Sequence, residues 1–304
     1  MSGVPSLSKV VRRVPFPYRA PHAPNGVEPG PTTARTGADF PTEWARRYPA
    51  RVARLALLEG VMRPTVAAIA PAERTGTERL DDLDGPVIFA ANHHSHVDTP
   101  LMLTSIPEPW RHRLFVGAAA DYFFGNQLTG TMSALALNAV PIERNRISRD
   151  SADAAAELID DGWSLLIFPE GGRSPDGWGQ EFRGGAAYLA LRCGVPIVPV
   201  HIEGTDRVLP KGRSRPRRSR TTVRFGDAIV PTPDDDTRRL AARLEAAVAV
   251  LADESRSDWW TARRNAASTA TPALTGPEAE GWRRTWALGE RDPKRRRTRR
   301  RWPE

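Results

Sequence analysis

The sequence predicts an α/β fold in which a central, mostly parallel sheet is flanked by helices. Short apolar runs alternate along the chain with amphipathic stretches of about a dozen residues, as in sheets covered by helices. The apolar runs lack the polar alternation of half-exposed strands, which is typical of strands buried on both faces. The 304 residues, 40% of them hydrophobic, suffice for one such domain with a substantial core.

Two segments precede this domain. We expect residues 1–40, rich in Pro and Gly, to be a flexible leader, because they cannot bury enough surface to offset their ordering entropy. Residues 41–72 are expected to be helical, since apolar residues recur at helical spacing among arginines from Trp44 to Met62. This helix either packs on the core or lies on an anionic lipid surface. Pro64 is expected to break it.

Residues 73–260 are expected to form the α/β domain. In chain order we predict strands at 87–91, 114–116, 139–142, 163–168, 196–202 and 221–225, and helices after Ser95 and at 128–137, 151–159, 185–192 and 237–251. Ser151 is expected to cap one helix, and Gly162 and Gly194 to end two of them. Beyond residue 260 the chain becomes polar, so residues 261–304 are expected to be a basic tail.

Bulk composition excludes several classes of protein. The net charge of +8 is concentrated at residues 281–304, which hold ten Arg or Lys against three acidic residues. One cysteine, Cys193, allows no internal disulfide and fits a reducing compartment. The sequence contains no run of about eighteen uncharged apolar residues, so a membrane-spanning helix is not expected. Pro15 and Pro17 interrupt the N-terminal region, so no cleaved secretory signal is expected.

The strongest chemical signal is the stretch from Val87 to Asp98, where a buried strand ends in a histidine cluster. We expect Ser95 to cap the following helix, with Asp98 in its first turn. At this corner Asp98 can hydrogen-bond one ring nitrogen of His93 and leave the other as a base. A base without an enzyme nucleophile suits direct acyl transfer to a substrate hydroxyl. No nucleophile elbow, Walker A loop or dinucleotide-binding loop offers another site.

The same cluster has other interpretations. His94-x-His96-x-Asp98 partly resembles the His-x-His-x-Asp-His signature of metallo-β-lactamase-type hydrolases, with Thr99 in place of the last histidine. A site for a single metal ion could use the same histidines. The cluster could also be purely structural.

Two further stretches place charged residues where strands end. Phe-Pro-Glu-Gly-Gly-Arg-Ser at 168–174 follows a buried strand, and its glycines allow positive φ and close backbone approach. The strand at 139–142 is followed by Arg144. Ligands bind at the carboxyl ends of parallel strands, so we expect Arg144 and Arg173 to bind a phosphate near His93.

Together these stretches resemble the lysophospholipid (1-acylglycerol-3-phosphate) acyltransferase family over roughly residues 80–229. The His-x4-Asp pair of that family falls on His93 and Asp98, and its Phe-Pro-Glu-Gly-x-Arg-Ser block falls on 168–174. Its Gly-x-Ile-x-Ile-x-Arg block falls on 138–144, with Asn138 replacing the glycine. We assign phosphate binding to Arg144, Glu170, Gly171 and Arg173, and a pocket or structural role to Asn92, Ser95, Gly172, Ser174 and Pro199.

The resemblance implies transfer of a fatty acyl group from acyl-CoA or acyl carrier protein to the free hydroxyl of 1-acyl-sn-glycerol 3-phosphate, giving phosphatidic acid. It implies no metal and no resident cofactor. Its implied partners are the lysolipid acceptor, the thioester donor and an anionic membrane surface, with the enzyme peripheral on the cytoplasmic face of the cell membrane. The basic run at 294–302 could aid that contact, and nucleic-acid binding is not expected.

Overall fold

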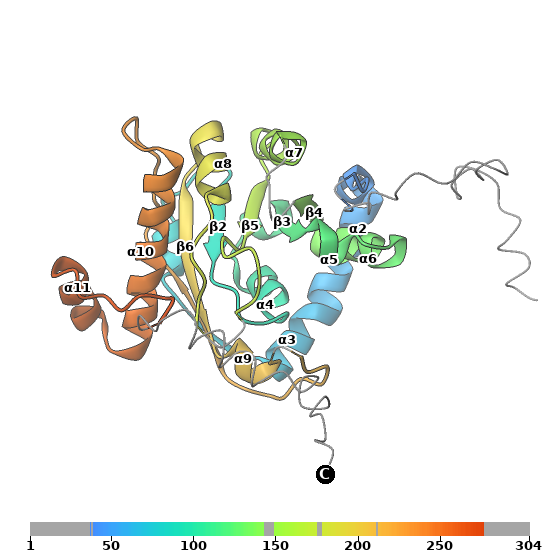
Figure 1. Ribbon diagram of the computed structural model, residues 1–304. Coiled ribbons are helices and arrows are strands. Elements are labelled where there is room, and N and C mark those ends of the chain that lie inside the picture. Colours follow the sequence, from blue (N-terminus) through green and yellow to red (C-terminus); the bar gives the residue numbers. More distant parts are fainter. Residues whose placement is uncertain (1–36, 38, 143–148, 175–177, 211, 277–304) are drawn as a thin grey trace, which may run out of the picture. The chain divides into compact units, whose positions relative to one another are not determined.

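A seven-stranded sheet forms the centre of the structure, a computed structural model that describes residues 37, 39–142, 149–174, 178–210 and 212–276 (Figure 1). The strands are β1 (Ala72–Thr75), β2 (Ile88–Ala91), β3 (Leu114–Ala119), β4 (Ala139–Ile142), β5 (Ser164–Ile167), β6 (Ile197–Glu203) and β7 (Thr221–Phe225). Their order in the sheet is β1-β7-β6-β2-β5-β3-β4. The five strands from β6 to β4 are parallel, whereas β7 is antiparallel to β6 and pairs in parallel with β1. The predicted mostly parallel sheet is confirmed.

The helical elements cover both faces of this sheet. They are η1 (Glu43–Arg46), α2 (Tyr48–Leu57), η2 (Leu58–Met62), α3 (Arg63–Ile69), η3 (Thr77–Leu80), α4 (Asp98–Ser105), η4 (Trp110–Arg113), α5 (Ala120–Phe123), α6 (Gln127–Leu137), α7 (Arg149–Asp160), α8 (Gly185–Cys193), α9 (Thr205–Val208), α10 (Thr237–Arg256) and α11 (Trp259–Ala267). Asp236 caps α10 by accepting a hydrogen bond from the backbone N–H of Arg239. Gly194 ends α8 in the left-handed conformation, as predicted.

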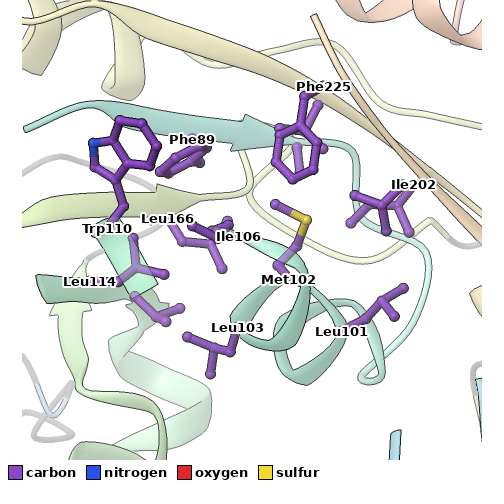
Figure 2. Packing of buried hydrophobic residues seen from close by; sticks show 14 of the residues in the cluster. Phe89, Leu101, Met102, Leu103, Ile106, Trp110, Leu114, Leu166, Ile202 and Phe225 are labelled. Atoms are coloured by element: carbon purple, nitrogen blue, oxygen red, sulfur yellow. The ribbon is translucent and has the colours of Figure 1, made fainter. Parts of the chain in front are cut away.

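The central strand β2 divides the core into two layers. Phe89 and Ala91 belong to the cluster beneath α3 and α4, whereas Ile88 and Ala90 belong to the cluster beneath α7, α8 and α10. Figure 2 shows the first cluster, in which the rings of Trp110 and Phe225 meet Phe89 edge-on. Because β2 is buried on both faces, its sequence is apolar throughout. Full burial of each large apolar side chain contributes about 1.5–3 kcal/mol.

The N-terminal helical segment is only partly packed on the core. Leu58 and Val66 are buried, and Arg54 donates hydrogen bonds to the carbonyls of Leu135 and Ala134 at the end of α6. Burial lowers the pKa of Arg54 to about 10. The apolar side chains Tyr48, Val52, Leu55 and Val61 are exposed. No helix in the described part of the chain is both long and apolar enough to cross a membrane.

Several predicted boundaries were wrong for identifiable reasons. The helix continues past Pro64, because the wider turn of η2 precedes it and Pro64 occupies the first turn of α3, where no backbone donor is needed. Ser151 does not cap α7, which begins two residues earlier. Strand β1 and helices α9 and α11 were not predicted.

The ends of the predicted domain also differ from expectation. The ring of Phe40 packs against that of Phe124 with centroids 5.3 Å apart and planes inclined by 46°, so the fold begins before residue 41. At the other end α11 packs on α10 and buries Ala262, so the first residues assigned to the tail belong to the fold. Residues 1–36 of the predicted leader and the basic run at 294–302 lie outside the described residues.

Candidate active site

The predicted pair of His93 and Asp98 is formed at the corner between β2 and α4. His93 Nδ1 lies 2.8 Å from Asp98 Oδ2. The same carboxylate oxygen, which is fully buried, accepts the backbone N–H groups of His94 at 2.6 Å and Ser95 at 2.8 Å. With Asp98 accepting from Nδ1, the other ring nitrogen of His93 carries a lone pair that can take a proton.

The sequence folds into this corner because Asp98 reaches backward from the first turn of α4. Its carboxylate satisfies the N–H groups of the preceding loop and complements the positive end of the helix. Ser95 therefore does not cap the helix, whose cap position is Val97. Instead its hydroxyl accepts the N–H of Val97 and donates to the carbonyl of Leu209, which ties the loop to the end of α9.

Residues 168–174, which follow the parallel strand β5, hold His93 from the other side. The ring of Phe168 stacks on the imidazole with centroids 4.2 Å apart and planes inclined by 21°. The backbone N–H of Ser174 donates to the carbonyl of His93 at 2.8 Å, and the hydroxyl of Ser174 donates to the carbonyl of Trp178. The imidazole is thus oriented by Asp98 and by Phe168, although no sequence pattern had indicated the second contact.

Glu170 is not placed to bind a phosphate, contrary to expectation. Its side chain is 2% exposed, and its two oxygens accept the backbone N–H groups of His93 at 2.8 Å and Gln180 at 2.9 Å. Burial raises the pKa of Glu170 to about 7, although the two N–H groups oppose the shift. Glu170 therefore joins the His93 loop to the chain ahead of α8.

Asn92 joins the same loop to the neighbouring strand β6. Its side-chain amide donates to the carbonyl of Ile202 at 2.8 Å, and its oxygen accepts the N–H of Ile202 at 2.7 Å. This buried pair of bonds agrees with the structural role predicted for Asn92. Pro199 on β6 does not shape the pocket, however, because it packs against Gly226 beneath α10 and is not among the pocket-lining residues.

A pocket of about 420 Å³ adjoins the imidazole. Its apolar lining comes from η2, β3, α5, α6, β4 and β5 and includes Met62, Val116, Phe123, Leu137, Ile142 and Ile167. Gly117 also lines it, and a Cβ at that position would lie 2.7 Å from Ile142 Cδ1. Pockets of this size hold small organic ligands, and this lining suits a hydrocarbon chain.

Two arginines contribute to the polar lining of this pocket. Arg173, which was predicted from the sequence, lies close to His96. Burial lowers the pKa of His96, and the positive charge of Arg173 lowers it further. Arg183, which was not predicted, packs its guanidinium against Gly171. Gly171 has a φ of +69°, and a Cβ there would lie 2.9 Å from Arg183 Nε. Arg144 lies outside the described residues.

The alternative interpretation as a metal site is not supported by the side-chain positions. The two histidines have different neighbours. His96 stacks on Tyr122 and lies 3.0 Å from its hydroxyl oxygen. His94 instead lies near enough to Asp206 and Arg256 for their charges to act on it. Asp98 Oδ2 is already engaged by His93 and the loop backbone. Within the described residues, no group of three His, Cys, Asp or Glu side chains is arranged to hold a metal ion.

Comparisons with known proteins cover the region that holds this site. Residues 72–203 match the family model described as Acyltransferase. The 1-acyl-sn-glycerol-3-phosphate acyltransferase BAT2 of Brassica napus is 32% identical over 45% of this chain and 38% of its own length. A 1-acyl-sn-glycerol-3-phosphate acyltransferase of Chlamydomonas reinhardtii is 30% identical over 55% of this chain and 49% of its own. The aligned part of the chain thus spans about half or less of these relatives.

A solved structure shares the fold. The crystal structure of the 1-acyl-sn-glycerophosphate acyltransferase PlsC from Thermotoga maritima superposes with a TM-score of 0.52 at 24% identity. The match covers 73% of this chain and 87% of the other. The likeness therefore extends beyond the residues that match the family model.

Proposed function

We propose that this chain, whose residues 72–203 match the acyltransferase family model, acylates the free hydroxyl of 1-acyl-sn-glycerol 3-phosphate, giving phosphatidic acid. The observation that carries the proposal is the His93–Asp98 pair beside an apolar pocket that is also lined by Arg173 and Arg183. The names of the relatives in plants and algae, which specify this acceptor, support the same conclusion.

In the proposed reaction His93 acts as a general base. Its unbonded ring nitrogen takes the proton of the acceptor hydroxyl while the hydroxyl oxygen attacks the carbonyl carbon of the thioester. The tetrahedral intermediate then collapses, the carbon–sulfur bond breaks, and the imidazolium returns its proton to the departing thiolate. Asp98 stabilises the transient positive charge on the ring and keeps it oriented. This sequence needs no enzyme-bound acyl group and no resident metal or cofactor.

The pocket suggests how the substrates are placed. We assign the apolar part, with Val116, Leu137 and Ile142, to a hydrocarbon chain, since burying each methylene contributes about 0.8 kcal/mol. Arg173 and Arg183 are assigned to the acceptor phosphate, because guanidinium groups bind phosphate through charge-assisted bonds. The donor is a fatty acyl thioester of either CoA or acyl carrier protein.

The decisive experiment compares acceptors that differ only in the phosphate. Purified enzyme is assayed with 1-acyl-sn-glycerol 3-phosphate and with the corresponding monoacylglycerol, using both donors and mass spectrometry of the products. For Arg183→Gln we expect KM for the phosphate-bearing acceptor to rise about 10–100-fold, which corresponds to about 1.5–3 kcal/mol for a lost charge-assisted bond. The exposed Arg192 on α8, replaced by Gln, is the matched control.

Two results would contradict the assignment. If phosphatidic acid is formed by neither donor while another lysolipid is acylated, the acceptor is wrong. If Arg183→Gln leaves KM unchanged for the phosphate-bearing acceptor, or raises it equally for monoacylglycerol, Arg183 does not bind the phosphate.

A further inference from the structure

Residues 270–276 form a strap that returns from the end of α11 to the chain just ahead of α8. The backbone N–H of Gly179 donates a hydrogen bond to the carbonyl of Leu274 in the strap at 2.9 Å. Gly276, with a φ of +83°, faces the indole of Trp178, and a Cβ at this glycine would lie 2.6 Å from Trp178 Cδ2. Only glycine allows the strap to approach the ring this closely.

The strap is anchored at its base and along its length. Helix α11 packs on α10, and the side-chain amide of Asn265 donates to the carboxylate of Asp253 on α10 at 2.8 Å. The backbone N–H of Ala270 then bonds the carbonyl of Asn265 at 2.8 Å. Leu274 packs against the apolar cluster beneath α7, α8 and α10. The strap is therefore a fixed part of the fold, although it lies beyond the residues that match the family model.

Both residues that flank Gly179 are hydrogen-bonded to the loop after β5. The carbonyl of Trp178 accepts the hydroxyl of Ser174 at 2.7 Å. The backbone N–H of Gln180 donates to the carboxylate of Glu170 at 2.9 Å. A contact that fixes Trp178 and Gly179 consequently fixes that loop at two points.

The same loop carries the groups that the proposed reaction uses. Ser174 donates its backbone N–H to the carbonyl of His93 at 2.8 Å, and Glu170 accepts the N–H of His93 at 2.8 Å. Arg173, which lines the pocket, lies next to Ser174 in the chain. A displacement of the loop by about 1 Å is enough to cost a reaction of this kind up to about a hundredfold in rate.

The indole of Trp178 is held by geometry more than by burial. Trp178 is 38% exposed, so it is not a core residue whose main role is to remove apolar surface from water. Arg256, at the end of α10, places its guanidinium carbon 5.7 Å from the centroid of the indole. The ring is thus fixed by α10 as well as by Gly276 in the strap.

We propose that Trp178 is a positioning residue for the reaction, and that the strap holds its indole so that the loop after β5 keeps His93 and Arg173 in place for acyl transfer. The inference rests on the proposed function in using His93 as the base. It does not depend on which lysolipid is the acceptor.

The first test compares two glycine substitutions in the full chain. Gly276→Ala adds a methyl group against the ring of Trp178. The control is Gly212→Ala, because Gly212 has a similar φ of +86° and no described atom lies within 4 Å of a Cβ there. Both variants carry the strain of a left-handed alanine, and only the first displaces the indole. We expect Gly276→Ala to lower kcat about 10–100-fold and the control to change it little.

Substitutions of Trp178 separate positioning from a general effect on stability. Trp178→Ala should lower kcat as Gly276→Ala does, whereas Trp178→Phe, which keeps a ring, should retain most of the rate. The double variant should be no slower than Trp178→Ala alone, because both changes act through one contact. Hydrogen exchange at the amides of Ser174 and Gly179 should become faster in Gly276→Ala and not in Gly212→Ala. A loss of stability alone would not produce this pattern in kcat.

The outcomes that contradict the proposal are distinct from those that contradict the proposed function. Equal kcat in the two glycine variants, or a wild-type kcat in Trp178→Ala, would overturn it. Effects of Gly276→Ala and Trp178→Ala that multiply in the double variant would also overturn it, because the strap would then act elsewhere. The assays use whichever lysolipid the wild type acylates, so a wrong acceptor leaves this test intact. If exchange at Ser174 is unchanged in Gly276→Ala, the strap does not hold the loop, whatever the reaction.

Discussion

Replacing Glu170 by Gln tests whether this carboxylate joins the His93 loop to the rest of the site. The side chain is almost fully buried, and each of its oxygens accepts one backbone N–H, from His93 and from Gln180. Gln offers one acceptor only, so one buried N–H loses its partner and faces an amide donor. The cost in unfolding free energy should be about 1–3 kcal/mol. Displacement of His93 should lower kcat by up to about a hundredfold.

The pH dependence of stability gives a second, more specific readout. Burial raises the folded-state pKa of Glu170 from 4.5 to about 7, so the folded protein binds this proton more tightly than the unfolded chain. The corresponding stability, about 3 kcal/mol, is fully present below about pH 4.5 and is lost as the pH rises through about 7. Glu170→Gln cannot titrate and should lack this component.

The assay is urea unfolding of the wild type and of Glu170→Gln across that pH window. The difference in unfolding free energy between them should grow in favour of the wild type as the pH falls. Glu157→Gln, at an exposed position on α7, serves as the control. If the wild type and Glu170→Gln have the same stability at every pH and the same kcat, the role assigned to Glu170 is wrong.

Three shorter predictions concern the loop, the pocket and metal dependence. Asn92→Ala leaves the N–H and carbonyl of Ile202 unpaired and should cost about 2–6 kcal/mol in urea unfolding; a smaller change would mean the loop is held otherwise. Gly117→Ala places a methyl group against Ile142 and should shift kcat/KM in favour of shorter acyl thioesters. The control Gly60→Ala, which has open space around the new methyl group, should not change this preference. If Gly117→Ala leaves the preference for chain length unchanged, the hydrocarbon chain binds elsewhere. Dialysis against a chelator should leave turnover unchanged, and a loss restored by added metal would contradict the proposed chemistry.

The sequence was most informative where local chemistry decides the structure. β2 could be predicted because a strand buried on both faces must be apolar throughout. The pairing of His93 with Asp98 could be predicted because a strand-to-helix corner brings residues at that spacing together. β1 escaped prediction because this edge strand, Ala-Glu-Arg-Thr, is half exposed and has no apolar pattern.

The parts that could not be predicted depend on contacts between distant segments. Glu170 looks like a ligand-binding charge in sequence, and only the folded chain brings the N–H groups of His93 and Gln180 to its two oxygens. Arg183 belongs to none of the sequence motifs that indicated the site, and it reaches the pocket because Gly171 leaves room for its guanidinium group. The apolar pocket is likewise assembled from strands that are far apart in the chain.

Single-turnover transfer of a radiolabelled acyl group by His93→Ala is the most direct test of the central claim, that this imidazole is the base. With folding confirmed by circular dichroism, we expect the transfer rate to fall by about 10²–10⁴-fold or more relative to the wild type. A correctly folded His93→Ala enzyme that transfers the acyl group at the wild-type rate would contradict the account.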